Sequence, residues 1–196
     1  RHQVGAYASA QGIVRDSYFG SGQDPDAYGA TKDMTIVAGA QYTYSFYRLL
    51  FMPSKLTAGL EYNNNMLHDK YLAAGRDFRQ TTYTTGLFVQ NEWQSEMLNI
   101  LIGARLDKHN MMKNVVLSPR VNVRYSPTEF IGLRASYSSG YRAPHAYNED
   151  LHIDALDDKL VLIRLNPDLK PEYSQSISSS VDLYHRFGMV QTNVLV

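Results

Sequence analysis

The chain has 196 residues, with 19 basic and 19 acidic side chains and therefore a formal net charge of zero. This balance excludes a strongly basic nucleic-acid-binding protein and an acidic disordered tail as descriptions of the whole chain. The absence of cysteine excludes disulfides, thiol catalysis, iron–sulfur clusters and cysteine zinc sites.

The pattern of apolar residues has a period of two, which is the period of a β-strand with one apolar face. Between residues 55 and 62, for example, Leu56 and Leu60 alternate with Thr57 and Glu61. Strands of this kind, some of them less regular, are expected at 3–15, 34–47, 55–62, 82–93, 98–107, 120–125, 131–137, 176–184 and 189–196. No apolar run approaches the roughly 20 residues of a membrane-spanning helix. We predict an all-β chain, an antiparallel up-and-down meander of about nine strands.

The connections between these strands are expected to alternate in length. Long loops are expected at 16–33, 63–81 and 141–172, with a medium loop at 108–114. Short links or tight turns are expected at 48–54, 94–96, 126–129 and 186–188. All long loops would then lie at one end of the sheet, which is typical of outer-membrane barrels. A soluble up-and-down barrel or other soluble β-sheet ligand-binding protein remains an alternative.

The residues on the two faces favour a membrane barrel. The polar face is rich in Gly, Ser, Thr, Asn and Arg and poor in Lys, unlike the exterior of a soluble barrel. Tyr62, Tyr125 and Tyr137 are expected at strand ends, where barrels carry aromatic girdles. The chain begins at Arg1 without a leader, and residues 191–196 have the pattern of a strand interior. We therefore expect residues 1–196 to be one partial domain, a segment of a large transmembrane β-barrel.

Four segments in the second half resemble the C-terminal part of the barrel of TonB-dependent outer-membrane receptors, particularly the Bacteroides type. The matching segments are 117–127 (LSPRVNVRYSP), 133–144 (LRASYSSGYRAP), 149–153 (EDLHI) and 166–172 (NPDLKPE). Upstream, 86–93 (GLFVQNEW) looks like the strand that precedes a periplasmic turn in this family. Residues 1–82 fit the same architecture without a motif of their own.

The resemblance implies a receptor in the cell outer membrane, with a plug domain inside a barrel of about twenty-two strands. Such receptors take up scarce ligands with energy that the TonB protein delivers through the plug region, which we do not find in this sequence. An iron chelate such as a siderophore is the expected ligand, with haem, cobalamin and glycan as alternatives within the family. A passive outer-membrane porin is the alternative from another class. Outer-membrane lipid and a small-molecule ligand are the expected partners.

The strands on either side of the longest loop place two charged residues opposite each other. Pro144 ends one strand because it has no N–H for the ladder, and Pro167 and Pro171 bring the chain back into the next. Arg142 and Glu172 both belong to the polar face by parity, so we expect them to pair or to share a hydrogen-bond network. Such a pair would act as a structural clasp that anchors the loop, or as a ligand contact.

The same loop holds two histidines. The segments 141–144 and 166–172 resemble the boxes that flank a ligand histidine in haem receptors of this family, and His145 and His152 lie between them. An iron porphyrin transported as ligand is therefore conceivable through an imidazole nitrogen, whereas solvated loop histidines are the alternative. Tyr141, Arg142, His145 and His152 are our candidate ligand-binding residues.

The polar face also carries a wall of basic residues. Its members are Arg105, Arg120, Arg124 and Arg134. Arginine binds carboxylates and phosphates in bidentate fashion, so this wall could attract anionic chelates. The alternative is that these arginines bond to the plug and to neighbouring strands.

Sites for catalysis and for resident metals are not expected. Asp154, Asp157 and Asp158 lack the spacing of a calcium-binding EF-hand loop, and His145 with His152 has no third zinc ligand at a recognisable spacing. No nucleophile elbow, phosphate loop or dinucleotide fingerprint is present. We therefore expect a protein that is not an enzyme and has no intrinsic cofactor.

Overall fold

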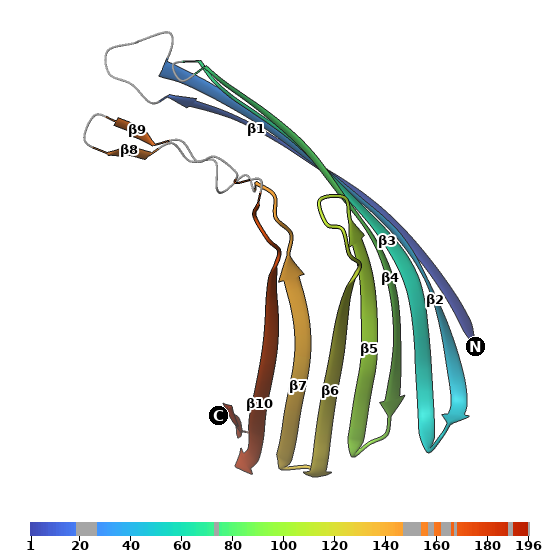
Figure 1. Cartoon of the computed structure of the whole chain (residues 1–196). Helices are drawn as coiled ribbons and strands as arrows, with labels where there is room; N and C mark the ends of the chain where they lie inside the picture. The colour runs from blue at the N-terminus through green and yellow to red at the C-terminus, as the bar shows by residue number, and fades with distance from the viewer. Residues whose placement is uncertain are drawn as a thin grey trace.

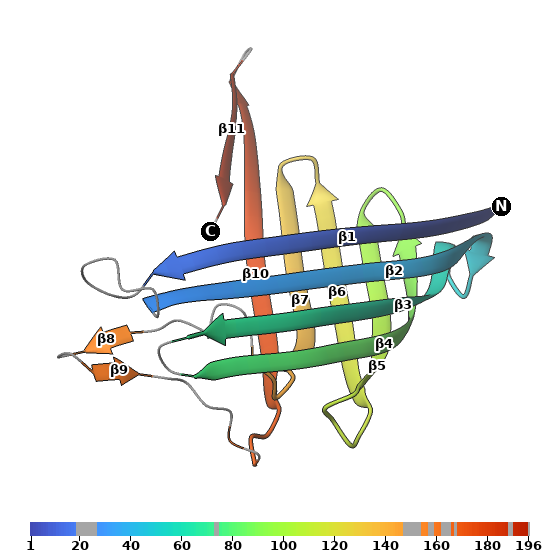
Figure 2. The ribbon, with the colours of Figure 1, turned by 90° about the horizontal axis from the view of Figure 1, so that it is seen from above.

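The computed structural model describes residues 1–18, 27–72, 75–146, 154–156, 159–161, 166, 168–187 and 190–195. Within these residues the chain forms eleven β-strands, all of which are labelled in Figure 2, and Figure 1 shows the same ribbon from another side. They are β1 (His2–Tyr18), β2 (Tyr28–Leu49), β3 (Met52–Tyr71), β4 (Arg76–Gln94), β5 (Leu98–His109), β6 (Val116–Thr128), β7 (Ile131–Arg142), β8 (Asp154–Leu156), β9 (Lys159–Val161), β10 (Glu172–Phe187) and β11 (Val190–Leu195). In this part of the chain no helix has the length and apolar character needed to cross a membrane.

Nine of the described strands form one sheet in the order β1-β2-β3-β4-β5-β6-β7-β10-β11. Every neighbouring pair is antiparallel. Strands β8 and β9 form a separate short hairpin within the connection from β7 to β10. The predicted antiparallel meander of about nine strands is therefore confirmed.

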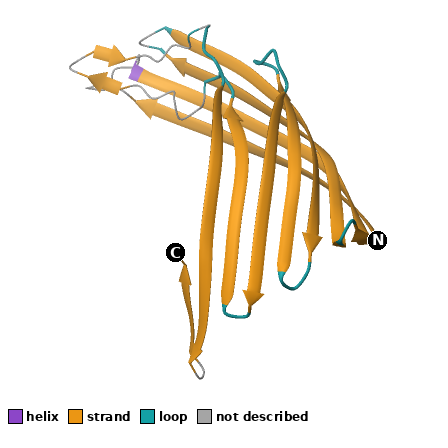
Figure 3. Ribbon diagram, turned by 60° about the horizontal axis from the view of Figure 1, so that its bottom comes forward, coloured by secondary structure: helices purple, strands orange, loops and turns teal. Residues whose placement is uncertain are grey.

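The sheet is strongly twisted and curved. In Figure 2, β1–β4 run across the direction of β6, β7 and β10, and Figure 3 shows the sheet bending like part of a barrel wall. The right-handed twist of each strand accumulates over a large sheet and produces such curvature. The two faces of the sheet therefore have different surroundings.

One face, which we call the outer face, is apolar. The register aligns Ala40, Leu60, Leu87, Leu106 and Leu117 side by side across β2 to β6. Leu60, Leu87 and Leu117 are each more than half exposed, at 52%, 56% and 58%. Large aliphatic side chains in a continuous exposed band indicate a surface that does not meet water in the whole protein.

The opposite face, which we call the inner face, is polar. The adjacent row, which runs from β1 to β5, consists of Tyr7, Gly39, Glu61, Gly86 and Asp107. The chain just after β7 folds back onto this face and buries the little apolar surface that the sheet has there. The inner face is therefore the one on which a site for a polar ligand can form.

The first four strands are much longer than the sequence pattern indicated. Strand β3 has 20 residues and β4 has 19, so the expected loop at 63–81 is wrong and the connection is only 72–75. The expected loop at 16–33 likewise shrinks, because β1 continues to Tyr18 and β2 begins at Tyr28. Polar residues dominate both faces of these strand ends, and the few apolar residues, Met66, Leu67 and Phe78, are divided between the faces. The alternation therefore disappears although the backbone ladder continues.

The aromatic residues correct the expected position of one girdle. Tyr62 lies in the middle of β3, not at its end, and contacts Tyr83 of β4 with a ring-centroid distance of 6.4 Å. A strand needs about 9–11 residues to cross a bilayer, so strands of 19 or 20 residues extend well past an aromatic boundary. The Tyr62–Tyr83 contact therefore marks a level within the sheet rather than its edge.

Short connections join the strands at the opposite end of the sheet (Figure 1). The connections 50–51, 95–97 and 129–130 are all turns of two or three residues. Trp93 of β4 holds the first of them, because its Nε1 donates to the carbonyl oxygen of Leu49 at 3.0 Å and its ring stacks on Phe51. The expected short turns at this end are confirmed within a few residues.

Candidate ligand-binding site on the inner face

Residues 143–146, which follow β7, lie against the inner face of β3 and β4. Gln80 of β4 holds them, because its Nε2 donates to the carbonyl oxygen of Ala146 at 2.8 Å and its Oε1 accepts from the amide of Ala146 at 3.1 Å. Ala146 also packs with Leu67 and Phe78 in a small apolar cluster. We call residues 143–146 the covering loop, since they close the inner face at this end.

One histidine of the covering loop contacts a histidine of the sheet. The rings of His109 and His145 are stacked, with centroids 5.2 Å apart and an angle of 10° between their planes. His109 is only 4% exposed, and this burial lowers the pKa of its imidazole. Its Nδ1 accepts from the amide of Met111 at 3.0 Å, so the neutral ring carries its proton on Nε2. His109 follows the apolar stretch of β5 and lies beyond the band of exposed leucines.

A cavity of about 380 Å³ lies beside these histidines, and we call it the loop cavity. Tyr141, His145 and Ala146 line one side of it. The opposite side consists of strand residues with hydroxyl, amide and carboxylate groups, namely Asp33, Thr35, Asn63, Asn65, Thr82 and Thr84. Such a cavity can orient a small polar ligand through several hydrogen bonds.

A second polar site lies further along the inner face, where four side chains form one network. The guanidinium of Arg105 donates from Nη2 to Glu61 Oε1 at 2.9 Å and from Nε to Asp107 Oδ1 at 2.7 Å. The hydroxyl of Tyr7 donates to the other oxygen of Glu61. The network therefore connects β1, β3 and β5, which are not neighbours in the sheet.

Glycines on the strands in between allow this network to form. A Cβ at Gly39 would overlap the ring of Tyr7, and a Cβ at Gly86 would overlap the guanidinium of Arg105. The side chains of Tyr7 and Arg105 therefore lie flat over the bare backbone of β2 and β4, respectively. A glycine that a neighbouring side chain crosses in this way is required for close approach, not for its backbone angles.

A cavity of about 500 Å³ lies over this network, and we call it the wall cavity. Tyr7, Glu61, Arg105 and Arg120 line it. Arg120 donates from Nη2 to Oε1 of Gln90 on β4. The cavity thus presents two guanidinium groups together with acceptor oxygens.

The two remaining arginines of the expected basic wall lie further across the sheet, on β6 and β7. Arg134 Nη2 is 2.8 Å from Oδ2 of Asp182, whose side chain is only 1% exposed. Arg124 is opposite Arg134 in the register and is exposed. Both arginines line a third inner-face cavity, of about 340 Å³. All four arginines share the inner face, and two of them have carboxylate partners.

The residues expected around the long loop are only partly brought together. Tyr141 and His145 line the loop cavity, whereas Arg142 is not among its lining residues. Arg142 lies directly opposite Glu172 in the pairing of β7 with β10. His152, Asp157 and Asp158 lie outside the described residues, and of the three expected loop acids only Asp154 is placed, in the short strand β8.

Sequence reasoning missed Gln80, His109, Tyr7 and Glu61 as site residues. The sequence pattern predicts a loop at Gln80, because the apolar alternation stops before it. The signal for Tyr7 and Glu61 was present but faint: Gly39 and Gly86 each interrupt a strand pattern, and an isolated strand glycine indicates close approach of another group. Nothing in the spacing of His109 and His145 indicated that their rings would stack.

A resident metal centre has no support from the described residues. Among them, no group of three or more His, Asp or Glu side chains is placed to hold a metal ion. The polar groups of the loop cavity and the wall cavity suit hydrogen bonding and charge pairing with a ligand.

The family model described as "TonB dependent receptor-like, beta-barrel" matches residues 2–194. No curated protein matches the chain significantly. Solved structures of siderophore receptors share the fold.

Three of these structures illustrate the likeness. A mutant of the ferric enterobactin receptor PfeA from Pseudomonas aeruginosa has 19% identity and a TM-score of 0.72, over 93% of this chain and 30% of its own. The siderophore receptor PirA from P. aeruginosa has 16% identity and a TM-score of 0.67, over 95% of this chain and 38% of its own. PirA from Acinetobacter baumannii has 15% identity and a TM-score of 0.65, over 98% of this chain and 31% of its own.

These identities are low, so the structural likeness shows the fold alone, and the chain spans about a third of the length of these receptors. The expected Bacteroides-type subgroup stays a prediction. The family match, in contrast, covers almost every residue from β1 to β11. The chain therefore belongs to the TonB-dependent receptor-like β-barrel family.

Proposed function

We propose that this chain is one wall segment of an outer-membrane receptor that takes up a ferric siderophore with energy from TonB. The proposal rests on one observation: the polar inner face carries two cavities. The wall cavity presents Arg105 and Arg120, and the loop cavity lies under the covering loop. Guanidinium groups bind the anionic oxygens of chelates. Residues 1–196 are then a partial barrel domain.

The outer face and the relatives support the location. An exposed apolar band that runs across β2 to β6 suits contact with lipid. A ferripyoverdine receptor with 14% identity and a TM-score of 0.59, over 99% of this chain and 30% of its own, is described as a protein of the outer membrane of P. aeruginosa. Members of this family are receptors and transporters, and we propose no enzymatic role. TonB, acting through a plug region, is the proposed protein partner.

The covering loop is the proposed gate of the ligand site. We propose that Arg142 and Glu172 act as a clasp at its base, since the register sets them opposite each other where β7 ends and β10 begins. Tyr141 and His145 are the proposed ligand contacts from the loop side, since both line the loop cavity. His152 stays a candidate from the sequence.

The test is uptake of iron-55 by cells that express the full-length receptor carrying this segment. Ferric enterobactin and ferripyoverdine are suitable probes, since receptors of the same fold are described with these ligands. We expect uptake of one ferric chelate, and loss of that uptake in a host without TonB. Uptake that persists without TonB would instead indicate a passive porin, and absence of uptake for every chelate would refute the proposal.

Two substitutions test the wall. Arg120→Gln removes a guanidinium from the wall cavity, and we expect ligand affinity to fall about tenfold, the effect of losing one charge-assisted hydrogen bond. Lys113→Gln is the matched control, because Lys113 is an exposed cation outside both cavities. Equal affinities of the two variants would show that Arg120 does not contact the ligand.

Haem is the second candidate ligand, and one observation favours it. His145 lines the loop cavity beside His109, so an imidazole faces a space that a ligand can enter. Titration of the full-length receptor with haem, followed by the Soret band, tests this alternative. A shift that disappears in His145→Ala would favour haem over a siderophore, and no shift would remove it.

A further inference from the structure

On the outer face, exposed apolar residues give way to basic residues near the end of the sheet that the covering loop contacts. Met34 of β2 and Met66 of β3 lie opposite each other and are both exposed. The next outward-facing residues on these strands are Lys32 and His68, which are also opposite each other. Two residues of a strand span about 7 Å, so basic groups follow these two methionines directly.

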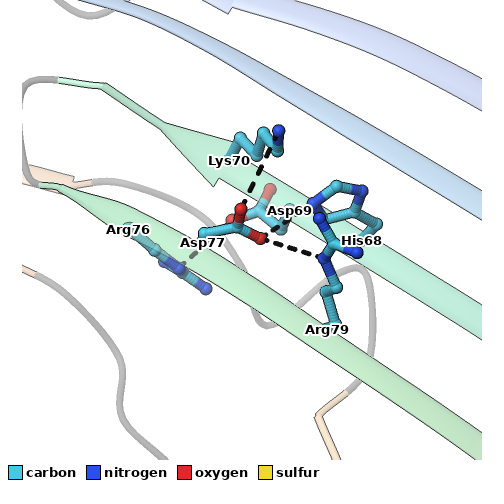
Figure 4. Close-up of polar contacts among 6 residues, drawn as sticks. All are labelled: His68, Asp69, Lys70, Arg76, Asp77 and Arg79. Atoms are coloured by element: carbon cyan, nitrogen blue, oxygen red, sulfur yellow. Dashed lines mark hydrogen bonds and ion pairs between the residues drawn. The ribbon is translucent and has the colours of Figure 1, made fainter.

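The basic groups form a row across three strands. Lys32 of β2, His68 of β3 and Arg79 of β4 are consecutive partners in the register. Lys70 and Asp77 are the outward-facing pair in the next row (Figure 4). We call Lys32, His68 and Arg79, together with Lys70 of the next row, the basic row. Like charges so close together repel one another unless an anion lies between them.

A single carboxylate partly neutralises this row. Asp77 Oδ1 lies 2.8 Å from Nε2 of His68 and 3.3 Å from Nε of Arg79, and its Oδ2 lies 3.8 Å from Nζ of Lys70 (Figure 4). These contacts hold the pKa of Asp77 below its usual value, chiefly through the hydrogen bond from His68. Among the described residues of β1 to β4, the other outward-facing acid at this end is Asp16, which lies across Ala30 from Lys70. Within these described residues, the three fixed positive charges of Lys32, Lys70 and Arg79 therefore meet two negative ones.

Donor groups of the row still point outward. The guanidinium of Arg79 uses only Nε toward Asp77, and its side chain is 69% exposed. Lys32 is exposed and has no ion-pair partner among the residues that the structure describes. Cα atoms two strands apart are separated by about 10 Å, so both long side chains can reach the same anion from either side of His68.

We propose that the basic row is a binding site for a phosphate group on the headgroup of an outer-leaflet lipid. Charge complementarity supports a phosphate, and the exposed methionines directly below supply an apolar surface for the rest of an amphiphile. The row is on the outer face, opposite both ligand cavities, so a transported ligand does not reach it. This proposal rests on the outer-membrane location proposed above but not on the identity of the ligand.

The test uses the purified full-length receptor in uncharged detergent micelles and a fluorescent diphosphorylated lipid A as probe. We expect the variant with Lys32→Gln, Lys70→Gln and Arg79→Gln to bind it about a hundredfold more weakly, from about fivefold for each cation. The control carries Arg48→Gln, Lys55→Gln and Lys113→Gln, exposed cations outside the row, and should lose less than about threefold. Equal losses in the two triple variants would overturn the proposal.

Two further comparisons use the unmodified receptor, so the result does not depend on folding of the variants. Dephosphorylated lipid A should bind at least about tenfold more weakly than the diphosphorylated form, and equal binding would overturn the proposal. Inorganic phosphate at the same concentration should not displace the lipid, and displacement would show a site for free phosphate instead. Iron-chelate uptake measured on the same proteins separates the two proposals: failed uptake with intact lipid binding removes only the transport function.

Discussion

Arg105 reaches Glu61 across the bare backbone of Gly86, and the distance from Nη2 to Oε1 is 2.9 Å although 44 residues separate the two in sequence. The ion pair skips a strand: Glu61 is on β3, Arg105 on β5, and Gly86 on β4 between them. A side chain at position 86 would occupy the space of the guanidinium. The ion pair between Arg105 and Glu61 therefore depends on the absence of a Cβ at position 86.

The first prediction follows from this geometry. Gly86→Ala should displace Arg105 from Glu61 and Asp107 and destabilise the full-length receptor by about 1–2 kcal/mol, the loss expected when two partly buried ion pairs are disrupted. Urea unfolding in lipid vesicles measures the change. Gly12→Ala is the matched control, because a Cβ there meets nothing within 4 Å. Equal stability of the two variants would contradict the role of Gly86.

Gly59 extends this comparison to a more severe clash. A Cβ at Gly59 would lie 2.5 Å from the ring of Phe88 and 2.7 Å from the backbone oxygen of Ala40. Backbone atoms move less easily than the end of an arginine side chain. Gly59→Ala should therefore destabilise the receptor more than Gly86→Ala, by about 1–3 kcal/mol as for other overpacked sites. The reverse order would contradict this explanation.

The covering loop gives the third prediction. Gln80→Met keeps the volume of the side chain but removes both hydrogen bonds to Ala146. Hydrogen exchange of the Ala146 amide should accelerate about tenfold, since each lost bond contributes about 1 kcal/mol. Gln94→Met on the same strand is the control, because Gln94 is exposed and far from the loop. Unchanged exchange in Gln80→Met would mean that other contacts hold the loop.

Asp182 and Arg134 provide a rescue experiment. Arg134→Met leaves the buried carboxylate of Asp182 without its counter-charge and should destabilise the receptor by about 3 kcal/mol. Adding Asp182→Asn removes that charge and should restore part of the stability. Urea unfolding of the two single variants and the double variant measures the coupling. Additive losses would show that the two side chains act independently.

The fifth prediction concerns pH and His109. Burial lowers the pKa of His109 in the folded protein, whereas the unfolded chain takes up this proton near pH 6.5. Between the two pKa values the unfolded chain binds more protons, so the free energy of unfolding falls as the pH decreases below about 6.5. His109→Asn, whose Oδ1 can accept from the amide of Met111, should weaken this pH dependence.

The measurement is urea unfolding at several pH values between 7.5 and 5 for the receptor and for His109→Asn. Every other titrating group is common to both proteins, so their difference reports on His109. A difference that does not change with pH would contradict a lowered pKa. Loss of stability at high pH alone would contradict the sign of the prediction.

The alternation of residues in short segments was enough to predict the fold. The apolar positions of 55–62 and 98–107 repeat every second residue, and only a strand places such residues on one face. This pattern indicated the number and direction of the strands and assigned Arg105, Arg120, Arg124 and Arg134 to one face. The face on which a residue lies can be predicted in this way, because the alternation of side chains is a property of each strand alone.

The pattern failed where polar residues dominate both faces of a strand. Residues 63–71 and 76–81 read as a loop, yet the ladder between β3 and β4 continues through them, because a backbone pairs whether or not its side chains alternate. Strand length is decided by the neighbouring strand. The positions of Gln80 and of the basic row therefore could not be predicted without the register.

The sequence by itself determined that this chain is an antiparallel sheet with one apolar and one polar face, and it indicated the family. Only the tertiary structure decided which polar groups meet. Tyr7, Glu61 and Arg105 are far apart in sequence and come together because the strand register aligns them and two glycines let their side chains cross the strands in between. His109 meets His145 because the chain after β7 folds back over the sheet. Contacts of this kind depend on register and curvature, which are properties of the whole sheet and of no single strand.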